Sequence, residues 1–145
     1  MNGTRRKLMA LFPMAAAAAQ AAGTAVAKKV FYLNGKPKTT PLYSEVIAHG
    51  NLVFVSGHGV NNVPTVKEQT AAVLNNIDAC LKAAGTSMNN ALKCNVYLRH
   101  LEDYAAMNEV YLGRFGAEPP VRTTVAVAGI PLEGCLVEIE VIAAR

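Results

Sequence analysis

Residues 64–99 read PTVKEQTAAVLNNIDACLKAAGTSMNNALKCNVYLR, and this stretch contains the clearest helix and the clearest strand of the chain. Thr65 precedes the periodic residues and Glu68 follows three positions later, which is the capping-box pattern of a helix N-terminus. Gly85 ends the periodicity, as expected of a helix C-terminus. The helical stripe between them is Val66, Thr70, Val73, Leu74, Ile77, Leu81 and Ala84. Residues 91–99 alternate instead and predict a strand with an apolar side formed by Leu92, Cys94, Val96 and Leu98.

Shorter apolar runs on both sides of this pair predict the remaining elements. Upstream strands are expected at 29–33, 44–48 and 52–56, the last two joined by a hairpin turn at His49-Gly50-Asn51. Downstream, a helix at about 103–115 closed by Gly116 precedes Pro119-Pro120 and two strands at 122–128 and 136–143. The stripe of this second helix is Tyr104, Met107, Asn108, Tyr111 and Phe115.

The element order predicts an α+β domain. Two helices can cover only one face of a mixed sheet of about six strands. The last strand carries apolar Leu136 and Ile142 beside Glu138 and Glu140 on its second side. An apolar sheet face without helices usually needs a partner subunit, so we expect the chain to form an oligomer.

Composition limits the classes of function. At 145 residues, with 17% charged and 52% hydrophobic residues, the chain is one globular domain and not a disordered polypeptide. The net charge of +4 arises mainly from Arg5, Arg6 and Lys7, because removing these three from the 14 basic side chains leaves 11 against 10 acidic ones. The near-neutral remainder argues against a nucleic-acid partner.

The N-terminal segment resembles an export signal. Thr4-Arg5-Arg6-Lys7-Leu8-Met9 is similar to a twin-arginine motif, and the alanine-rich run behind it is too short to span a bilayer. Ala25-Val26-Ala27 offers small residues to a signal peptidase. We therefore expect residues 1–27 to be a cleaved signal and residues 28–145 to be a single exported, periplasmic domain with no membrane contact after processing. The alternative is a disordered or alanine-rich arm on a cytoplasmic protein.

Neither cysteine nor histidine indicates a metal centre. Cys80, Cys94 and Cys135 form no C-x-x-C arrangement and are expected to be buried as small hydrophobes. The three histidines lack the spacing of zinc ligands. No metal or cofactor is implied.

Several motifs, taken in order, resemble the RidA/YjgF family of reactive-intermediate deaminases. The most specific is Pro119-Pro120-Val121-Arg122-Thr123-Thr124-Val125, followed by Val137-Glu138-Ile139-Glu140. The other matching stretches are Pro41 to Glu45, Gly50 to Gly57, Glu68-Gln69-Thr70 with Leu74-Asn75-Asn76, Met107 to Tyr111, and Ile130-Pro131. The resemblance implies the chorismate-mutase-like fold, a homotrimer with active sites between subunits, and hydrolysis of 2-aminoacrylate-like enamines or imines to 2-keto acid and ammonia without a cofactor.

Two side chains are candidates for the chemistry within that resemblance. Arg122 offers a planar fork that can hold a small carboxylate through two hydrogen bonds, although an arginine at a strand end is more often in a surface ion pair. Glu138 could move protons between a water molecule and the leaving amine, or could be a solvated strand residue, which is the better interpretation for Glu140.

Other residues are expected to complete the pocket. Tyr43 could close it and donate its phenolic proton, or could be a packed interface aromatic. Backbone amides at Ser56 and Gly57 could hold a substrate oxygen, because glycine allows close approach. Thr124, where many family members have cysteine, and Asn108, in the second-helix motif, are further expected substrate contacts.

Besides Thr124, two departures from the family pattern put the substrate in doubt. His58 replaces a usual glutamine and would place a titratable ring near the pocket. The loop from Gly59 to Thr65 is shorter than the family loop. Two rival functions remain open: a non-catalytic trimer that binds small carboxylates, and an RNA-cleaving translation inhibitor, which the charge distribution disfavours.

Overall fold

A computed structural model describes residues 26–37 and 39–145. The twin-arginine motif and nearly all of the expected signal therefore lie outside the described residues. Within the described part no helix is long and apolar enough to cross a membrane.

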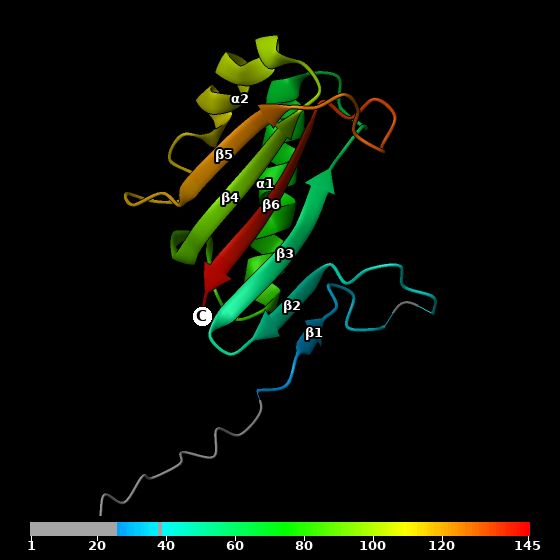
Figure 1. The fold of residues 1–145 in the computed structure, drawn as a ribbon, viewed down its shortest axis with the longest axis vertical. Coiled ribbons are helices and arrows are strands. Elements are labelled where there is room, and N and C mark those ends of the chain that lie inside the picture. The colour runs from blue at the N-terminus through cyan, green and yellow to red at the C-terminus, as the bar shows by residue number, and fades with distance from the viewer. Residues whose placement is uncertain (1–25, 38) are drawn as a thin grey trace, which may run out of the picture.

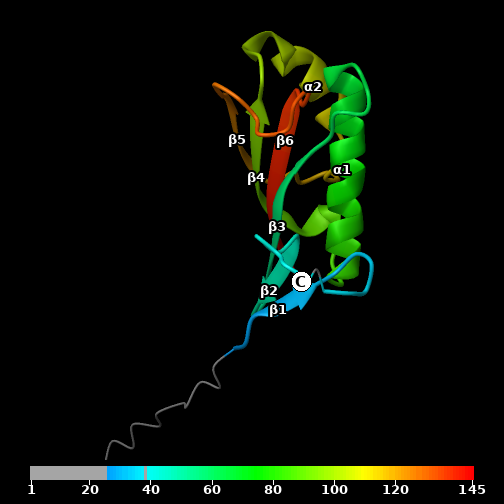
Figure 2. The same ribbon diagram turned by 90° about the vertical axis from the view of Figure 1, so that its right-hand side faces the viewer.

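The described residues form a mixed sheet with its helices on one side. The elements in chain order are β1 Lys29–Phe31, β2 Val46–His49, β3 Leu52–Gly59, α1 Val66–Ala83, β4 Ala91–Leu98, α2 Tyr104–Tyr111, β5 Val121–Ala126 and β6 Val137–Ala144, with short 3-10 turns at Met88–Asn90 and Leu101–Asp103. The sheet order is β1-β2-β3-β6-β4-β5 (Figure 1). Only the β4–β5 pair is parallel. Both helices lie on the same face (Figure 2), which confirms the predicted α+β architecture.

The helix ends follow the sequence signals. The Thr65 hydroxyl accepts the Glu68 amide and the Glu68 carboxylate accepts the Thr65 amide, which completes the predicted capping box. At the other end Gly85 has φ +81°, and the amides of Gly85 and Thr86 bond Lys82 O and Leu81 O. The helix therefore stops where glycine allows a left-handed residue.

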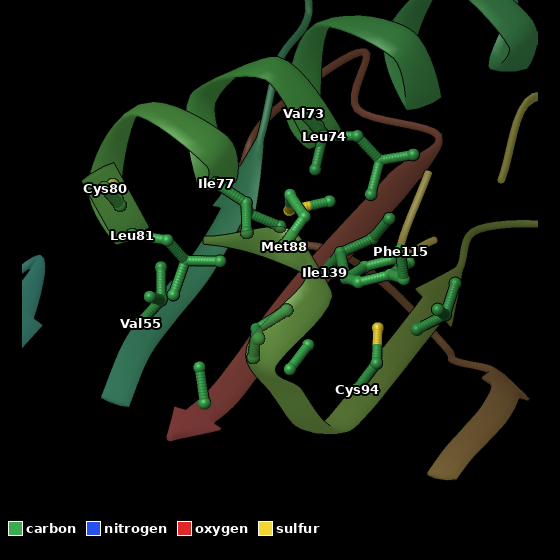
Figure 3. Packing of buried hydrophobic residues seen from close by; sticks show 14 of the residues in the cluster. Val55, Val73, Leu74, Ile77, Cys80, Leu81, Met88, Cys94, Phe115 and Ile139 are labelled. Atoms are coloured by element: carbon green, nitrogen blue, oxygen red, sulfur yellow. The ribbon is translucent and has the colours of Figure 1, made fainter. Parts of the chain in front are cut away.

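The core lies between α1 and the sheet (Figure 3). Val73, Leu74, Ile77 and Leu81 are fully buried against the sheet. Val137, Ile139, Val141 and Ala143 of β6 face them, as the alternation predicts. Cys80 and Cys94 are fully buried and Cys135 nearly so, which confirms that all three behave as small hydrophobes.

Leu92 was placed on the buried side of its strand, and this prediction is wrong. Its side chain is 47% exposed, whereas Ala91 and Cys94 are buried. The register advances by two residues on β4, from Ala91 to Lys93, but by only one on β6, from Ala143 to Ile142. This β-bulge moves Leu92 out of the alternation, which a strict two-residue period cannot anticipate.

The second helix is shorter than predicted. It ends at Tyr111, not at Phe115, because Gly113 takes φ +76° before the Gly116 stop is reached. Phe115 nevertheless remains buried and its ring centroid lies 4.9 Å from that of Tyr111. The other element ends differ from prediction by up to three residues.

The face opposite the helices is mixed, as predicted. Phe54 and Ile142 face each other across β3 and β6 on this side, and both are half-buried. Val121 is 69% exposed and Val125 is 43% exposed on the neighbouring part of β5. We call this surface the open face, and it is the surface for which the sequence predicted a partner subunit.

Candidate functional site

Arg122 lies on the helix-covered side of the edge strand β5. Its register partner on β4 is Cys94, whose side chain is in the core. The guanidinium carbon lies 4.6 Å from the ring centre of Tyr111 and 5.8 Å from that of Tyr104, both on α2. Nη2 donates a hydrogen bond of 3.3 Å to the Tyr104 hydroxyl. Two aromatic rings thus fix the orientation of the fork without neutralising its charge.

Thr124 on β5 and Asn108 on α2 are the other predicted residues on this side of the sheet. Thr124 is two residues further along β5 and shares its side of the strand, and its hydroxyl is buried without a hydrogen-bond partner among the described residues. Asn108 is one helical turn from both Tyr104 and Tyr111 on α2. We call Arg122, Thr124, Asn108, Tyr104 and Tyr111 the arginine half-site.

Tyr111 forms the inner wall of the arginine half-site. It is 8% exposed, and its buried hydroxyl interacts with the Cys94 side chain. Burial raises the pKa of Tyr111 above that of a free tyrosine, and it raises the pKa of the neighbouring Cys94 thiol to about 11. Neither group ionises near neutral pH, so Arg122 carries the only charge contributed by these side chains.

Glu138 lies on the open face. It alternates along β6 with the buried Val137 and Ile139, so its side chain points away from the helices. Its carboxylate rests directly on Gly57, because a Cβ added there would be 2.1 Å from Oε1. Glu138 also borders a cavity of about 230 Å³ together with Tyr97 and Pro131. This is a partly enclosed carboxylate beside space for a small molecule.

A β-bulge provides the room for Glu138. Val55 pairs with Val141, and His58 pairs with Ile139. Ser56 and Gly57 on β3 therefore oppose one residue on β6, the residue between Ile139 and Val141. Ser56 lines a second open-face cavity of about 600 Å³ that Tyr43 also borders. The Ser56 hydroxyl is buried without a partner among the described residues. Tyr43, Ser56, Gly57 and Glu138 are called the glutamate half-site.

Glu140 was interpreted as a solvated strand residue, and the structure corrects this. It is half-buried and accepts hydrogen bonds from Asn95 Nδ2 at 2.7 Å and Tyr97 Oη at 3.1 Å. Desolvation and the bond to Glu140 both raise the pKa of Tyr97. Glu140 also borders both open-face cavities, but its carboxylate is held in place by Asn95 and Tyr97.

His58 is adjacent to the glutamate half-site, but its ring lines neither of the two open-face cavities. The bulge returns it to the helix side, where Nδ1 lies 2.8 Å from Ser56 O and Nε2 lies 3.4 Å from Cys80 Sγ. The short loop before α1 is held by Gln69, whose amide donates to Val63 O and Gly134 O and accepts the Leu136 amide. Both departures from the family pattern are built into the interior packing.

The structure brings the predicted residues together in two groups and keeps the groups apart. The arginine half-site is on the helix-covered side of the outermost strand, and the glutamate half-site is on the open face of β3 and β6. One chain cannot direct Arg122 and Glu138 at the same small molecule, because the sheet lies between their side chains. The buried hydroxyls of Ser56 and Thr124, which have no partner among the described residues, would each cost about 1–3 kcal/mol if left unbonded.

Sequence reasoning assigned Tyr104 and Tyr111 only to the packing stripe of the second helix. Their positions three or four residues on either side of Asn108 could have identified them, because residues at this spacing share one helix face. The contact between that face and Arg122 requires the β4–β5 pairing, which local periodicity does not reveal. No cluster of His, Cys, Asp or Glu suited to a metal ion occurs in the part of the chain that the structure describes.

Comparison with known proteins finds relatives that are similar to this chain over most of its length. The family model described as Endoribonuclease L-PSP matches residues 33–145. A RutC family protein of Pyrococcus horikoshii is 41% identical over 123 residues, covering 80% of this chain and 97% of the relative. The chloroplastic Reactive Intermediate Deaminase A of Arabidopsis thaliana is 35% identical over 127 residues, covering 83% of this chain and 67% of that protein.

Solved structures agree in fold. A YjgF family protein from Neisseria meningitidis has 34% identity and a TM-score of 0.74, covering 83% of this chain and 97% of that chain. RidA from an Antarctic Psychrobacter has 33% identity and a TM-score of 0.72, covering 81% and 99% respectively.

Proposed function

The chain belongs to the RidA/YjgF family, and we propose that it hydrolyses small enamine and imine intermediates such as 2-aminoacrylate to 2-keto acid and ammonia. The relative named Reactive Intermediate Deaminase A supports this choice of reaction. The geometry of the two half-sites supports it independently, because one supplies a cation for a carboxylate and the other a carboxylate for proton transfer.

The observation that carries the proposal is the separation of Arg122 from Glu138 across the sheet. Two copies of the chain can unite the half-sites if the open face of one approaches the β5 edge of the next. Since each copy has both half-sites, this contact is head-to-tail, and three copies can close it into a ring. The homotrimer that the resemblance implies therefore provides three complete sites between subunits.

Arg122 binds the substrate. A guanidinium packed against two tyrosine rings presents parallel N–H groups and a positive charge to a carboxylate. Because the substrate's carboxylate does not change charge during hydrolysis, this interaction fixes position and affinity and leaves the reacting C=N centre free.

Glu138 from the neighbouring copy moves the protons. After the enamine tautomerises to the imine, a water molecule attacks the imine carbon while the Glu138 carboxylate accepts the water's proton. The protonated carboxyl then gives that proton to the nitrogen of the carbinolamine. The carbinolamine's hydroxyl proton then passes through the Glu138 carboxylate to the departing nitrogen as the C–N bond breaks, so ammonia leaves and the keto group forms. The Ser56 amide already donates to Glu45 O at 3.0 Å, so Gly57 is the backbone donor that we propose for the oxygen.

Ammonia release from enzymatically generated 2-aminoacrylate tests the proposal. We expect hydrolysis faster than the uncatalysed reaction and dependent on Arg122. Pyruvate binding without acceleration would instead favour a carboxylate-binding trimer. RNA cleavage with a strong salt dependence of RNA affinity would favour the activity named in the family model's description.

We further propose that residues 1–27 direct export through the twin-arginine motif, so that residues 28–145 act outside the cytoplasm. The basic, alanine-rich composition of this segment supports the proposal. The alternative is a cytoplasmic enzyme with an N-terminal arm. The relatives include proteins named as chloroplastic and mitochondrial, so family membership is compatible with more than one compartment.

A further inference from the structure

Tyr104 and Tyr111 contact the same guanidinium in different ways. Tyr111 is buried and its ring centre is 4.6 Å from the guanidinium carbon, so it packs against the inner side of Arg122. Tyr104 is 43% exposed, and its ring centre is 5.8 Å away. Tyr104 therefore lies at the exposed rim of the arginine half-site, with its hydroxyl bonded to the guanidinium.

The hydrogen bond between Arg122 and Tyr104 leaves the phenolic proton of Tyr104 without a partner in that bond. Arginine has no acceptor, so in the 3.3 Å contact the Tyr104 oxygen accepts from Nη2. The phenolic proton must point elsewhere, and no acceptor for it is present among the hydrogen bonds of the described residues. A carboxylate docked on the fork would place an oxygen beside this hydroxyl, because carboxylate and phenol would then share the same guanidinium edge.

We propose that Tyr104 is a second substrate-binding residue, whose hydroxyl accepts from Arg122 and donates its own proton to the substrate's carboxylate. The inference deepens the proposed function and rests on it. The site then offers a carboxylate two charged donors from Arg122 and one neutral donor from Tyr104, which suits a compact 2-imino or 2-oxo monocarboxylate.

Tyr104→Phe tests the hydroxyl while keeping the ring. Tyr32→Phe is the matched control, because Tyr32 is 39% exposed and lies beyond β1, at the opposite edge of the sheet from β5. Sodium pyruvate is titrated calorimetrically into the full-length wild-type protein, both variants and Arg122→Ala, and kcat and KM are measured with 2-aminoacrylate. A crystal structure with pyruvate shows whether the phenolic oxygen reaches the carboxylate.

We expect Tyr104→Phe to bind pyruvate roughly 10-fold more weakly, with KM raised by a similar factor and kcat nearly unchanged, because the lost bond is the same in ground and transition states. Tyr32→Phe should match the wild type. Unchanged affinity in Tyr104→Phe, alongside lost binding in Arg122→Ala, would overturn the inference and leave the proposed function intact. A fall in kcat at unchanged affinity would overturn it too. A wild-type protein that neither binds pyruvate nor hydrolyses 2-aminoacrylate would refute both.

Discussion

At the scale of single residues, Arg122 determines substrate binding in the proposed mechanism. Replacing it with alanine removes the only charge of the arginine half-site and leaves the core untouched, because the side chain packs on tyrosine faces at the strand edge. We expect Arg122→Ala to lose about 2–5 kcal/mol of transition-state stabilisation, a rate loss of roughly 30-fold or more. Steady-state ammonia release measures this, and size-exclusion chromatography controls for assembly. Equal activity in variant and wild type would remove Arg122 from the mechanism.

Glu138 should show a different kinetic signature. Glu138→Gln keeps the shape of the side chain and a hydrogen bond but cannot accept a proton, so kcat should fall by about 10²–10⁴ while pyruvate affinity changes little. Glu140→Gln is the matched control on the same strand, since Glu140 is engaged by Asn95 and Tyr97. Parallel losses of kcat and affinity in Glu138→Gln would indicate a binding role instead.

Which individual residues could be predicted depended on how local their signal was. The RidA/YjgF resemblance pointed to Arg122, Glu138, Ser56 and Gly57. The structure places Ser56 and Glu138 at cavities, packs Gly57 against Glu138 and stacks Arg122 on two tyrosine rings. The tyrosines beside Arg122 and the inward orientation of His58 depend on strand pairing and on a bulge. Neither feature has a signature in a short window of sequence.

At the scale of elements, the β3 bulge couples backbone geometry to the glutamate half-site. An added Cβ at Gly57 would meet Glu138 Oε1 at 2.1 Å, so Gly57→Ala must push the flexible carboxylate aside. We expect kcat to fall by roughly 10-fold or more, with stability changed by less than about 1 kcal/mol. In a Glu138→Gln background the same change should cost almost nothing further, because it acts through that carboxylate. Additive losses in the double variant would contradict this coupling.

The helix–sheet core should give the protein a stability that declines in alkali. Burial raises the pKa of the Cys80 and Cys94 thiols to about 11. In the unfolded chain these thiols ionise near their ordinary pKa, so the folded state binds more protons between about pH 9 and 11. The free energy of unfolding should therefore fall as pH rises through that window. Urea titrations at several pH values measure the slope, and a Cys80→Ala/Cys94→Ala variant with the same slope would refute the explanation.

Elements with both a period and a cap were predicted well, and those shaped by a register shift were not. The first helix has its capping box, stripe and terminal glycine in sequence, and α1 follows all three. The strand at 91–98 was recognised by alternation, but its Leu92 was misplaced because the partner strand imposes a bulge. The second helix carried two glycine stops, and the earlier one ends it.

At the scale of the whole molecule, we propose that the N-terminal segment determines where the protein acts. If Arg5-Arg6 is a twin-arginine motif, the mature chain should begin near Lys28 and appear in the envelope fraction. Replacing both arginines with lysine should retain the precursor in the cytoplasm without affecting assembly. Mass spectrometry that finds residues 1–27 intact on the native protein would contradict export and favour the cytoplasmic alternative.

The central claim is that each active site combines Arg122 of one copy with Glu138 of the next. Arg122→Ala and Glu138→Gln chains are each inactive alone, but any mixed trimer contains one contact at which an intact arginine meets an intact glutamate. Random reassembly of equal amounts should therefore restore about a quarter of the wild-type activity per chain, whereas chains carrying both substitutions should restore none. A mixture that remains as inactive as its parents, in trimers shown to have exchanged subunits, would contradict the account.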